Sequence, residues 1–350
     1  MLFEPSFLGR AGFYWFVGVV EDRLDPLKSG RVRVRCKAVH TADKTELPTD
    51  TLIWSNVSTP VSSSSTSGVG ETPKLVPGTW VWGFFLDGIE EQESVICGTW
   101  IGIQTQGANS NYGFNDPRTD FSSEPQKITP TYSADGSGST FQNAPVGSYP
   151  RADRLDEPDT SRLARNDSGM VPDQIVNKTA SRAIQQGIPI AGGGSWSEPA
   201  LFYNAVYPYN QVKESESGHA LEFDDTKGAE RVHLYHRTGS FYETGPDGSV
   251  IYKSIQDSYE LVSRNAYESV LGSKYTTVKA TYNLLANVIN IQSNTAINIT
   301  SIGDISFITP AASFSGILTV TGEIFADGGI STGTAPITSG GGFTTGGSGW

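Results

Sequence analysis

The chain has 350 residues and a mass of 37.6 kDa, enough for two or three compact units. Charged residues make up only 18% of it, while 39 glycines and 19 prolines favour turns, short strands and extended segments. The formal charge of −12 argues against binding to a nucleic-acid backbone, and no apolar run is long enough to predict a membrane span.

The first predicted domain covers residues 1–103. Runs rich in β-branched and aromatic residues, each bounded by turn residues, predict five strands at 13–20, 31–39, 52–57, 79–86 and 94–101. Helical periodicity is absent from this region. Five short strands in a region of this size are typical of a small closed barrel, and the OB fold is the expected type.

Residues 104–205 differ in composition, because Gly, Ser, Asn, Asp and Pro dominate and apolar residues occur singly. Such a segment buries too little apolar surface to fold as an independent domain. We therefore expect an extended linker laid over other surfaces, including those of partner subunits. Two pieces of it, 160–164 and 179–186, are candidates for short helices.

Residues 206–330 are expected to form a repetitive β structure. From residue 287 the blocks NVINIQSN, TAINITSI and GDISFITP align with a period of eight, and the phase continues backwards to Ile251 with one polar interruption at Asn283. Residues two apart share one side of a strand, so each block presents an apolar face. The predicted core positions are Tyr259, Tyr267, Tyr275, Ile289, Ile291, Ile297, Ile299, Ile305 and Phe307.

This period also constrains the assembly. Eight residues are too few for a full coil of a one-chain β-helix, and a ribbon with one apolar face does not persist alone in water. The simplest solution is a homotrimer in which three chains form an intertwined triple-stranded β-helix. The predicted fold class is thus all-β, with an OB barrel, a linker and a trimeric spike. Residues 331–350 lose the period and are predicted to form a glycine-rich tip or tail.

Two segments resemble a known family. WFVGVVEDRLDPLKSGRVRVR, residues 15–35, is similar to the N-terminal OB-fold domain of the baseplate hub–spike proteins of T-even-type contractile phages. Residues 206–250 resemble the start of the triple-stranded β-helix in those proteins and the matching region of VgrG spikes of type VI secretion. The most specific positions of this second match are Glu216, Ser217, Gly218, His219, Phe223, Asp224, Asp225 and Glu230.

The resemblance implies a structural protein. In that family a lysozyme domain lies between the barrel and the β-helix, whereas residues 104–200 here lack the apolar content and the helical periodicity of such a domain. No catalytic position is carried over, so a non-enzymatic protein is expected. The implied role is the trimeric hub and membrane-piercing spike of a contractile tail baseplate, which joins the tail tube to the baseplate and punctures the host envelope.

The implied partners are the tail tube and hub proteins, the baseplate wedge proteins and the host outer envelope. A separate protein that caps the tip is left open. The implied location is the tail baseplate of the virion, after synthesis in the host cytoplasm. Two other functions stay open as alternatives: a tail-associated enzyme that degrades the envelope or peptidoglycan, and an OB-fold nucleic-acid-binding protein.

Several acidic residues near the second match were weighed as catalytic groups. Glu216, Glu222, Asp224 and Asp225 lie close together in sequence, and paired carboxylates are the usual groups for glycoside hydrolysis. The favoured interpretation is structural: these acids cap turns and pair with the basic residues Lys213, Lys227 and Arg231 where strands begin.

No metal or cofactor is expected. His233 and His236 are three residues apart, which places them on opposite faces of a strand and prevents them from sharing a metal within one chain. An ion on a three-fold axis, held by one His from each chain, is left open. Cys36 and Cys97 are too few for a disulfide framework or a four-ligand zinc site.

A row of cations is the feature behind the nucleic-acid alternative. Arg31, Arg33, Arg35 and Lys37 alternate with apolar residues, so they share one face of a predicted strand, and OB barrels often bind single strands on such a face. Because the whole chain is acidic, contact with an acidic partner or a neighbouring protomer is the favoured interpretation. The nearby aromatic residues, expected in the barrel core or in a protomer interface, are Phe13, Trp15, Trp54, Trp80, Trp82 and Trp100.

Overall fold

The computed structural model describes residues 14–103, 109–117, 158–166, 184–215, 219–236, 238–315 and 317–322. The chain divides into two units, residues 1–280 and 281–350. Within the described ranges the regular structure is almost entirely β, and α1 (Arg162–Arg165) is the single α-helix. The predicted all-β class is therefore confirmed.

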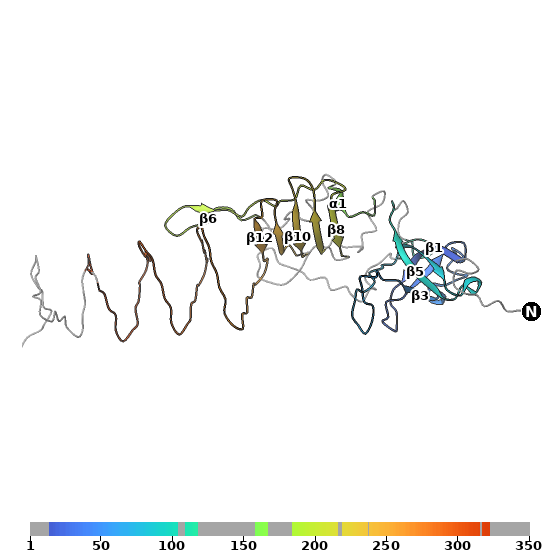
Figure 1. The fold of residues 1–350 in the computed structure, drawn as a ribbon, viewed down its shortest axis with the longest axis horizontal. Coiled ribbons are helices and arrows are strands. Elements are labelled where there is room, and N and C mark those ends of the chain that lie inside the picture. Colours follow the sequence, from blue (N-terminus) through green and yellow to red (C-terminus); the bar gives the residue numbers. More distant parts are fainter. Residues whose placement is uncertain are drawn as a thin grey trace, which may run out of the picture. The chain divides into compact units, whose positions relative to one another are not determined.

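The N-terminal strands form a closed barrel (Figure 1). They close in the order β1-β2-β3-β5-β4, with β3 and β5 parallel and the other pairs antiparallel, which is OB topology. Each strand overlaps one of the five predicted runs, so the predicted barrel is confirmed. The bounds are β1 (Tyr14–Asp22), β2 (Val32–Cys36), β3 (Trp54–Val57), β4 (Trp80–Phe85) and β5 (Ser94–Trp100).

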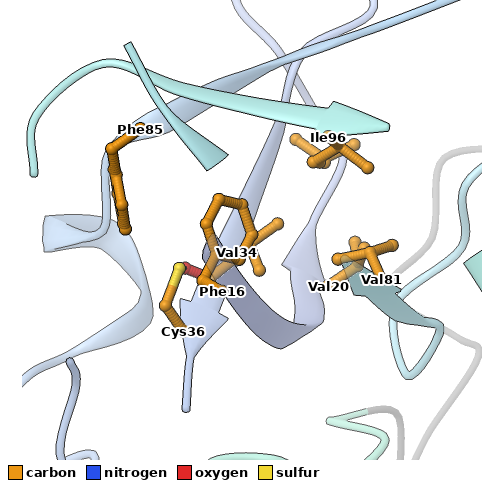
Figure 2. Packing of buried hydrophobic residues seen from close by; sticks show 8 residues of the cluster. Phe16, Val20, Val34, Cys36, Val81, Phe85 and Ile96 are labelled. Atoms are coloured by element: carbon orange, nitrogen blue, oxygen red, sulfur yellow. The ribbon is translucent and has the colours of Figure 1, made fainter. Parts of the chain in front are cut away.

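The barrel core follows from the two-residue alternation of its strands. In β2 the side chains of Val32, Val34 and Cys36 point inward, and Phe16 and Phe85 meet them with ring centroids 5.0 Å apart. Figure 2 shows these side chains converging from different strands. The other buried members of the cluster are Val20, Val81 and Ile96.

Glycine allows two of these strands to approach closely. A Cβ atom added at Gly83 in β4 would lie 2.0 Å from the carbonyl oxygen of Val95 in β5 and 2.9 Å from the ring of Phe16. The pairing of β4 with β5 also shifts register between Trp82 and Gly83. Gly83 is therefore required by the close contact of backbone with backbone and core.

A second sheet lies within residues 210–253. Its five strands form an antiparallel meander in which each strand pairs with the next along the chain. Gly228 and Gly248 adopt positive φ values of 79° and 82° in the turns that connect β9 to β10 and β11 to β12. The bounds are β8 (Asn210–Glu214), β9 (Ala220–Asp224), β10 (Arg231–Tyr235), β11 (Phe241–Thr244) and β12 (Val250–Lys253).

Two pieces of the predicted linker cover one face of this sheet. Leu163 in α1 and residues 201–203 pack against a cluster that includes Tyr235 and Phe241. The Tyr203 hydroxyl donates a 2.6 Å hydrogen bond to the carbonyl of Leu163, which ties the two pieces together. We call Leu163 and residues 201–203 the cover segment. The helix α1 overlaps the candidate helix at 160–164, whereas residues 184–186, the described end of the other candidate, are not helical.

Beyond β12 the chain is extended and no described residue up to 322 belongs to a strand. As far as residue 310 it bends at regular intervals, at 255–256, 263–264, 271–272, 279–280, 287, 294–295, 302–303 and 310, and further bends follow at 315 and 321–322. The changes of direction can be followed in Figure 1. The bends thus recur every seven or eight residues, which matches the period of the sequence. The predicted triple-stranded β-helix itself stays a prediction.

Candidate functional site

The meander β8–β12 has an unusual distribution of side chains between its two faces. The face under the cover segment holds charged residues, while the face away from it is exposed and apolar. Leu234 in β10 is 59% exposed and Tyr252 in β12 is 68% exposed. A large exposed apolar face is typical of an interaction surface. We call this surface the apolar face; its exposed members are Phe223, Val232, Leu234, Tyr242, Val250 and Tyr252.

The charged residues on the covered face form one connected cluster, which we call the buried charge cluster. Arg231 bridges two carboxylates, since NH2 lies 2.6 Å from Glu222 Oε2 and NH1 lies 3.0 Å from Glu243 Oε1. His233 Nδ1 is 2.7 Å from the other oxygen of Glu222. The amide of Asn210 donates a 2.9 Å hydrogen bond to Glu222. The side chains of Arg231, Glu222, Glu243 and His233 are completely inaccessible to solvent.

The ionisation of Glu222 depends on these contacts. Burial opposes its charge, but the hydrogen bond with His233, the charge of Arg231 and the hydrogen bond from Asn210 together lower its pKa below the ordinary value. Burial raises the pKa of Tyr203, whose ring lies 4.8 Å from the guanidinium of Arg231. The cluster is thus a buried ionic network, and the ring of Tyr203 from the cover segment packs against it.

A second apolar surface lies on the extended repeat. Every described residue from 256 to 322 is exposed. The predicted core positions are therefore all exposed in the single chain, from 48% at Ile305 to 90% at Tyr267. The structure contains one chain, so the assignment of these residues to a trimer core stays a prediction.

The family-signature positions lie around β9 and β10. Asp224 is buried in β9 and its Oδ1 accepts a hydrogen bond from the amide of Thr226, whereas Phe223 belongs to the apolar face. Asp225 and Glu230 are exposed in the turn region, and His219 precedes β9. Glu216, Ser217 and Gly218 lie outside the described residues.

The structural interpretation of the acidic residues is partly confirmed. Glu222 pairs with Arg231, as expected, and Asp224 caps the turn at Thr226. The expectation that all of these acids sit at turns where strands begin is wrong for Glu222, which is in the middle of β9 and fully buried. A carboxylate with no access to solvent is not placed to act on a polymeric substrate.

The histidines lie as predicted from their spacing. His233 is buried and His236 is exposed, on opposite faces, and the His233 ring packs 5.6 Å from that of Tyr235. His236 instead lies 4.4 Å from His219, at the end of the neighbouring strand. Among the described residues, no three His, Cys, Asp or Glu side chains gather in a way that would hold a metal ion.

The predicted row of cations on the barrel is engaged within the chain at three of its four positions, Arg31, Arg33 and Arg35. Arg35 is fully buried and bonds Glu21 at 2.7 Å, because the loop after β2 folds over it and supplies two carbonyl acceptors. Arg31 pairs with Asp25 at 2.8 Å, and Arg33 donates to the carbonyl of Thr49. These three arginines meet partners within their own chain, whereas Lys37 is exposed, and the expected contact with an acidic partner or a neighbouring protomer stays a prediction.

The tryptophans are expected in the barrel core or in a protomer interface; the structure does not place them in the core, and the interface stays a prediction. Trp15, Trp82 and Trp100 lie on the outside, where they line an open groove of about 490 Å³ together with Lys37. The core uses phenylalanine instead, since the inward positions of β1 and β4 fall on Phe16 and Phe85. Trp54 lies beneath the guanidinium of Arg33, with 4.6 Å from the guanidinium carbon to the ring centroid. Phe13 is outside the described residues.

The buried charge cluster was not predicted from the sequence as a unit. Its signal is the alternation of charged residues at a spacing of two, Glu222 with Asp224 and Arg231 with His233, in consecutive strands. Such alternation normally indicates the solvent-exposed face of an antiparallel strand. This face is buried because the cover segment packs on it. The sequence does not predict where the cover segment lies.

Comparison with known proteins shows similarity to the Gp5 proteins of phages. Residues 35–131 match the family described as the Gp5 N-terminal OB domain. The match begins at the end of β2 and includes β3, β4 and β5 of the barrel. Within the part of the chain that is described, no helix has the length and apolar character needed to cross a bilayer.

Two relatives extend this match. The protein Gp5 of Vibrio phage KVP40 is 38% identical over 301 residues, which cover 78% of this chain and 65% of the relative. The pre-baseplate central spike protein Gp5 of Enterobacteria phage T4 is 43% identical over 109 residues, which cover 29% of this chain and 19% of the relative. The chain thus spans less than two thirds of the length of either relative.

Proposed function

We propose, from the homology of this chain to the phage Gp5 baseplate central spike proteins, that it is a structural component of the tail baseplate in the virion. Its barrel belongs to the same OB family as the N-terminal domain of Gp5. In this role the barrel joins the spike to tail tube, hub and wedge proteins of the baseplate, and the C-terminal repeat forms the spike.

We propose further that the spike is a homotrimer. The observation that carries this step is the repeat after β12, where apolar side chains are exposed in every block and the chain bends with the same period. The described part of the chain provides no second layer that would bury these side chains, whereas two further copies would supply it. The apolar face of β8–β12 directly precedes the repeat and offers a continuation of the same interface.

The mechanism that follows is mechanical. Strands from three chains that pair around a common axis satisfy their backbone hydrogen bonds between chains and bury the apolar positions along a continuous core. Such a core resists bending when the contracting tail drives it against the host envelope. The proposed action is puncture of that envelope by a rigid rod, with no bond broken by the protein itself.

The test of the assembly is the mass of the purified full-length chain in solution. Multi-angle light scattering is expected to give three chains per particle, with no monomer at micromolar concentration. A well-ordered monomer with protected amides in residues 254–315 would overturn the trimer. A fragment that ends before residue 254 serves as the comparison for the contribution of the repeat.

The absence of catalysis is a separate proposal with its own test. The acids near the family signature are engaged in the fold, as the pairing of Glu222 with Arg231 illustrates. A zymogram on bacterial cell wall with the purified chain is therefore expected to show no clearing. Clearing by this chain alone, in a preparation from which other lytic proteins are absent, would favour the envelope-degrading alternative instead.

A further inference from the structure

The meander β8–β12 presents a problem of face selection. Its covered face contacts Leu163 and residues 201–203, which are themselves apolar or aromatic. Its other face is also apolar. A shift of one residue in the pairing of a strand moves every side chain of that strand to the opposite face of the sheet. If both faces were equally apolar, such a shift would cost little, and the cover segment could pack on either face.

We propose that the buried charge cluster selects the face: it fixes the strand register and directs the cover segment to one side, which leaves the apolar face for other copies of the chain. The second half of this statement rests on the proposed trimeric function. The first half concerns the single chain and is testable without it.

The strand pairing supports a role in register. His233 lies directly opposite Glu222 on one side and Glu243 on the other, and Arg231 lies opposite Asp224. The cluster therefore spans three consecutive strands. A slip of β10 by one residue would place Val232 or Leu234 opposite the carboxylates and would turn Arg231 and His233 toward the apolar face.

The cover segment recognises the charged face through specific contacts. The ring of Tyr203 lies 4.8 Å from the guanidinium carbon of Arg231, in cation–π range. The amide of Asn210 donates to the carbonyl of Leu163 at 3.1 Å and to Glu222 at 2.9 Å, so it links the helix α1 to the cluster. The apolar face offers no cation for the tyrosine at the equivalent strand positions, Val232 and Leu234.

The energetics of buried ions favour specificity as the role. Ionic networks without solvent access usually contribute little net stability compared with apolar residues of similar size. This network is also incompletely satisfied, since Arg231 Nε, His233 Nε2 and Glu243 Oε2 have no hydrogen-bond partner in the described part of the chain. Apolar residues at these positions would give the fold at least as much stability. Stability alone therefore does not account for the charged residues.

The experiment replaces the cluster by apolar residues of similar volume in the full-length chain: Glu222→Leu, Arg231→Met, His233→Phe and Glu243→Leu together. Hydrogen–deuterium exchange of peptides from 219–236 and 238–253 reports the strand pairing of each chain. Light scattering reports the number of chains per particle. A matched control removes the ion pair between Glu198 and Lys253, at the edge of the same covered face, by Glu198→Leu with Lys253→Met.

The proposal predicts that the fourfold variant folds but that its strands no longer pair in one unique register. Its strands should exchange at least about tenfold faster than in the wild type, or in two populations, and its particles should range in size. The control should exchange as the wild type does. The proposal is overturned if the fourfold variant keeps wild-type exchange and a uniform mass, or if it does not fold at all, because the second result would make the cluster a stabilising element.

The two proposals fail in distinguishable ways. If the wild-type chain is monomeric, the trimer is wrong, and the exchange data still decide whether the cluster sets the register. If the wild-type chain is a trimer and the fourfold variant is an equally uniform trimer with unchanged exchange, the face selection is wrong and the trimer stands. A single Arg231→Met variant, which leaves two carboxylates buried without a cation, should lose protection in all five strands.

Discussion

Arg35 shows how much a single side chain contributes to the barrel. Its guanidinium bonds Glu21 at 2.7 Å and donates to the carbonyls of Thr41 and Leu47, both at 2.7 Å. Glu21 also accepts a hydrogen bond from Thr49. The pair therefore ties β1, β2 and the loop after β2 together in the absence of solvent.

Removal of this cation is expected to destabilise the barrel strongly. Arg35→Met leaves buried Glu21 with only the more distant Lys44, 3.8 Å away, as a counter-charge and should lower the free energy of unfolding by about 3–5 kcal/mol. Urea denaturation followed by tryptophan fluorescence measures the loss. Lys37→Met is the control, because Lys37 is exposed and its loss should cost less than about 1 kcal/mol. Equal losses in the two variants would contradict the assigned importance of the buried pair.

Asp25 gives the barrel a dependence on pH. Hydrogen bonds from Arg31, Ser29 and the backbone of Leu27 hold the pKa of this carboxyl far below its ordinary value, despite its partial burial. A carboxyl whose pKa is lower in the folded chain stabilises the fold above its unfolded pKa, and this contribution is lost as the pH falls toward the folded pKa.

The expected result is a melting temperature that falls as the pH drops below about 5, with a smaller fall in Asp25→Asn than in the wild type. Circular dichroism between pH 7 and acid conditions measures the difference between the two proteins. Asp50→Asn, which removes an exposed carboxylate from the same domain, should follow the wild-type curve. If Asp25→Asn follows it as well, Asp25 is not a source of the pH dependence.

At the scale of elements, local patterns predict the barrel well and the meander only in part. All five barrel strands follow from β-branched and aromatic runs such as that of β1, because inward residues of these strands alternate and turn residues separate them. The burial of Arg35 does not follow from this pattern, since alternation with Val34 alone suggests a solvent-exposed cation. Arg35 is buried because the loop after β2 folds over it, and the alternation of residues within the strand does not predict the position of that loop.

The same limit applies to the candidate site. The exposed apolar positions of the repeat were identified from the period of eight, which is a local property of the sequence. The buried charge cluster required knowledge of the cover segment, where Tyr203 and Leu163 come from a stretch with scattered apolar residues. Sequence patterns report the two faces of a strand, but they do not report which face another segment covers.

Gly83 is the element-scale position most sensitive to added volume. Gly83→Ala should cost about 1–3 kcal/mol, because its Cβ would overlap the carbonyl of Val95 and force β4 and β5 apart. Gly102→Ala is the matched control, since nothing lies within 4 Å of its added Cβ. Thermal unfolding of both variants measures the difference. A neutral Gly83→Ala would show that the two strands can separate without loss of packing.

At the scale of the whole molecule, the single chain exposes more apolar surface than an isolated protein tolerates. Tyr267, Leu271 and Leu285 are each at least 90% exposed, and the apolar face of the meander adds to them. In the proposed assembly, the charge of −12 supplies repulsion between copies. Assembly must therefore gain enough from apolar burial to exceed this repulsion.

A single substitution in the repeat tests the proposed assembly. Ile297→Asp places a charge at a predicted core position and should reduce the trimer fraction at least about tenfold at a fixed micromolar concentration. Asn298→Asp, one residue further along, adds the same charge on the other side of the strand and should leave the mass unchanged. Analytical ultracentrifugation of the two variants gives the comparison. Equal effects would show that the repeat has no inward side.

The regular spacing of the bends has a consequence for alignment. Because the chain turns every seven or eight residues, two copies that slide past each other by one repeat would still match apolar with apolar along most of their length. The repeat alone therefore does not determine how two copies align along their length. Asn283 breaks the periodicity, and a misaligned copy would place this amide against hydrocarbon. In the proposed trimer, such an irregular position would therefore fix how the three chains align along their length.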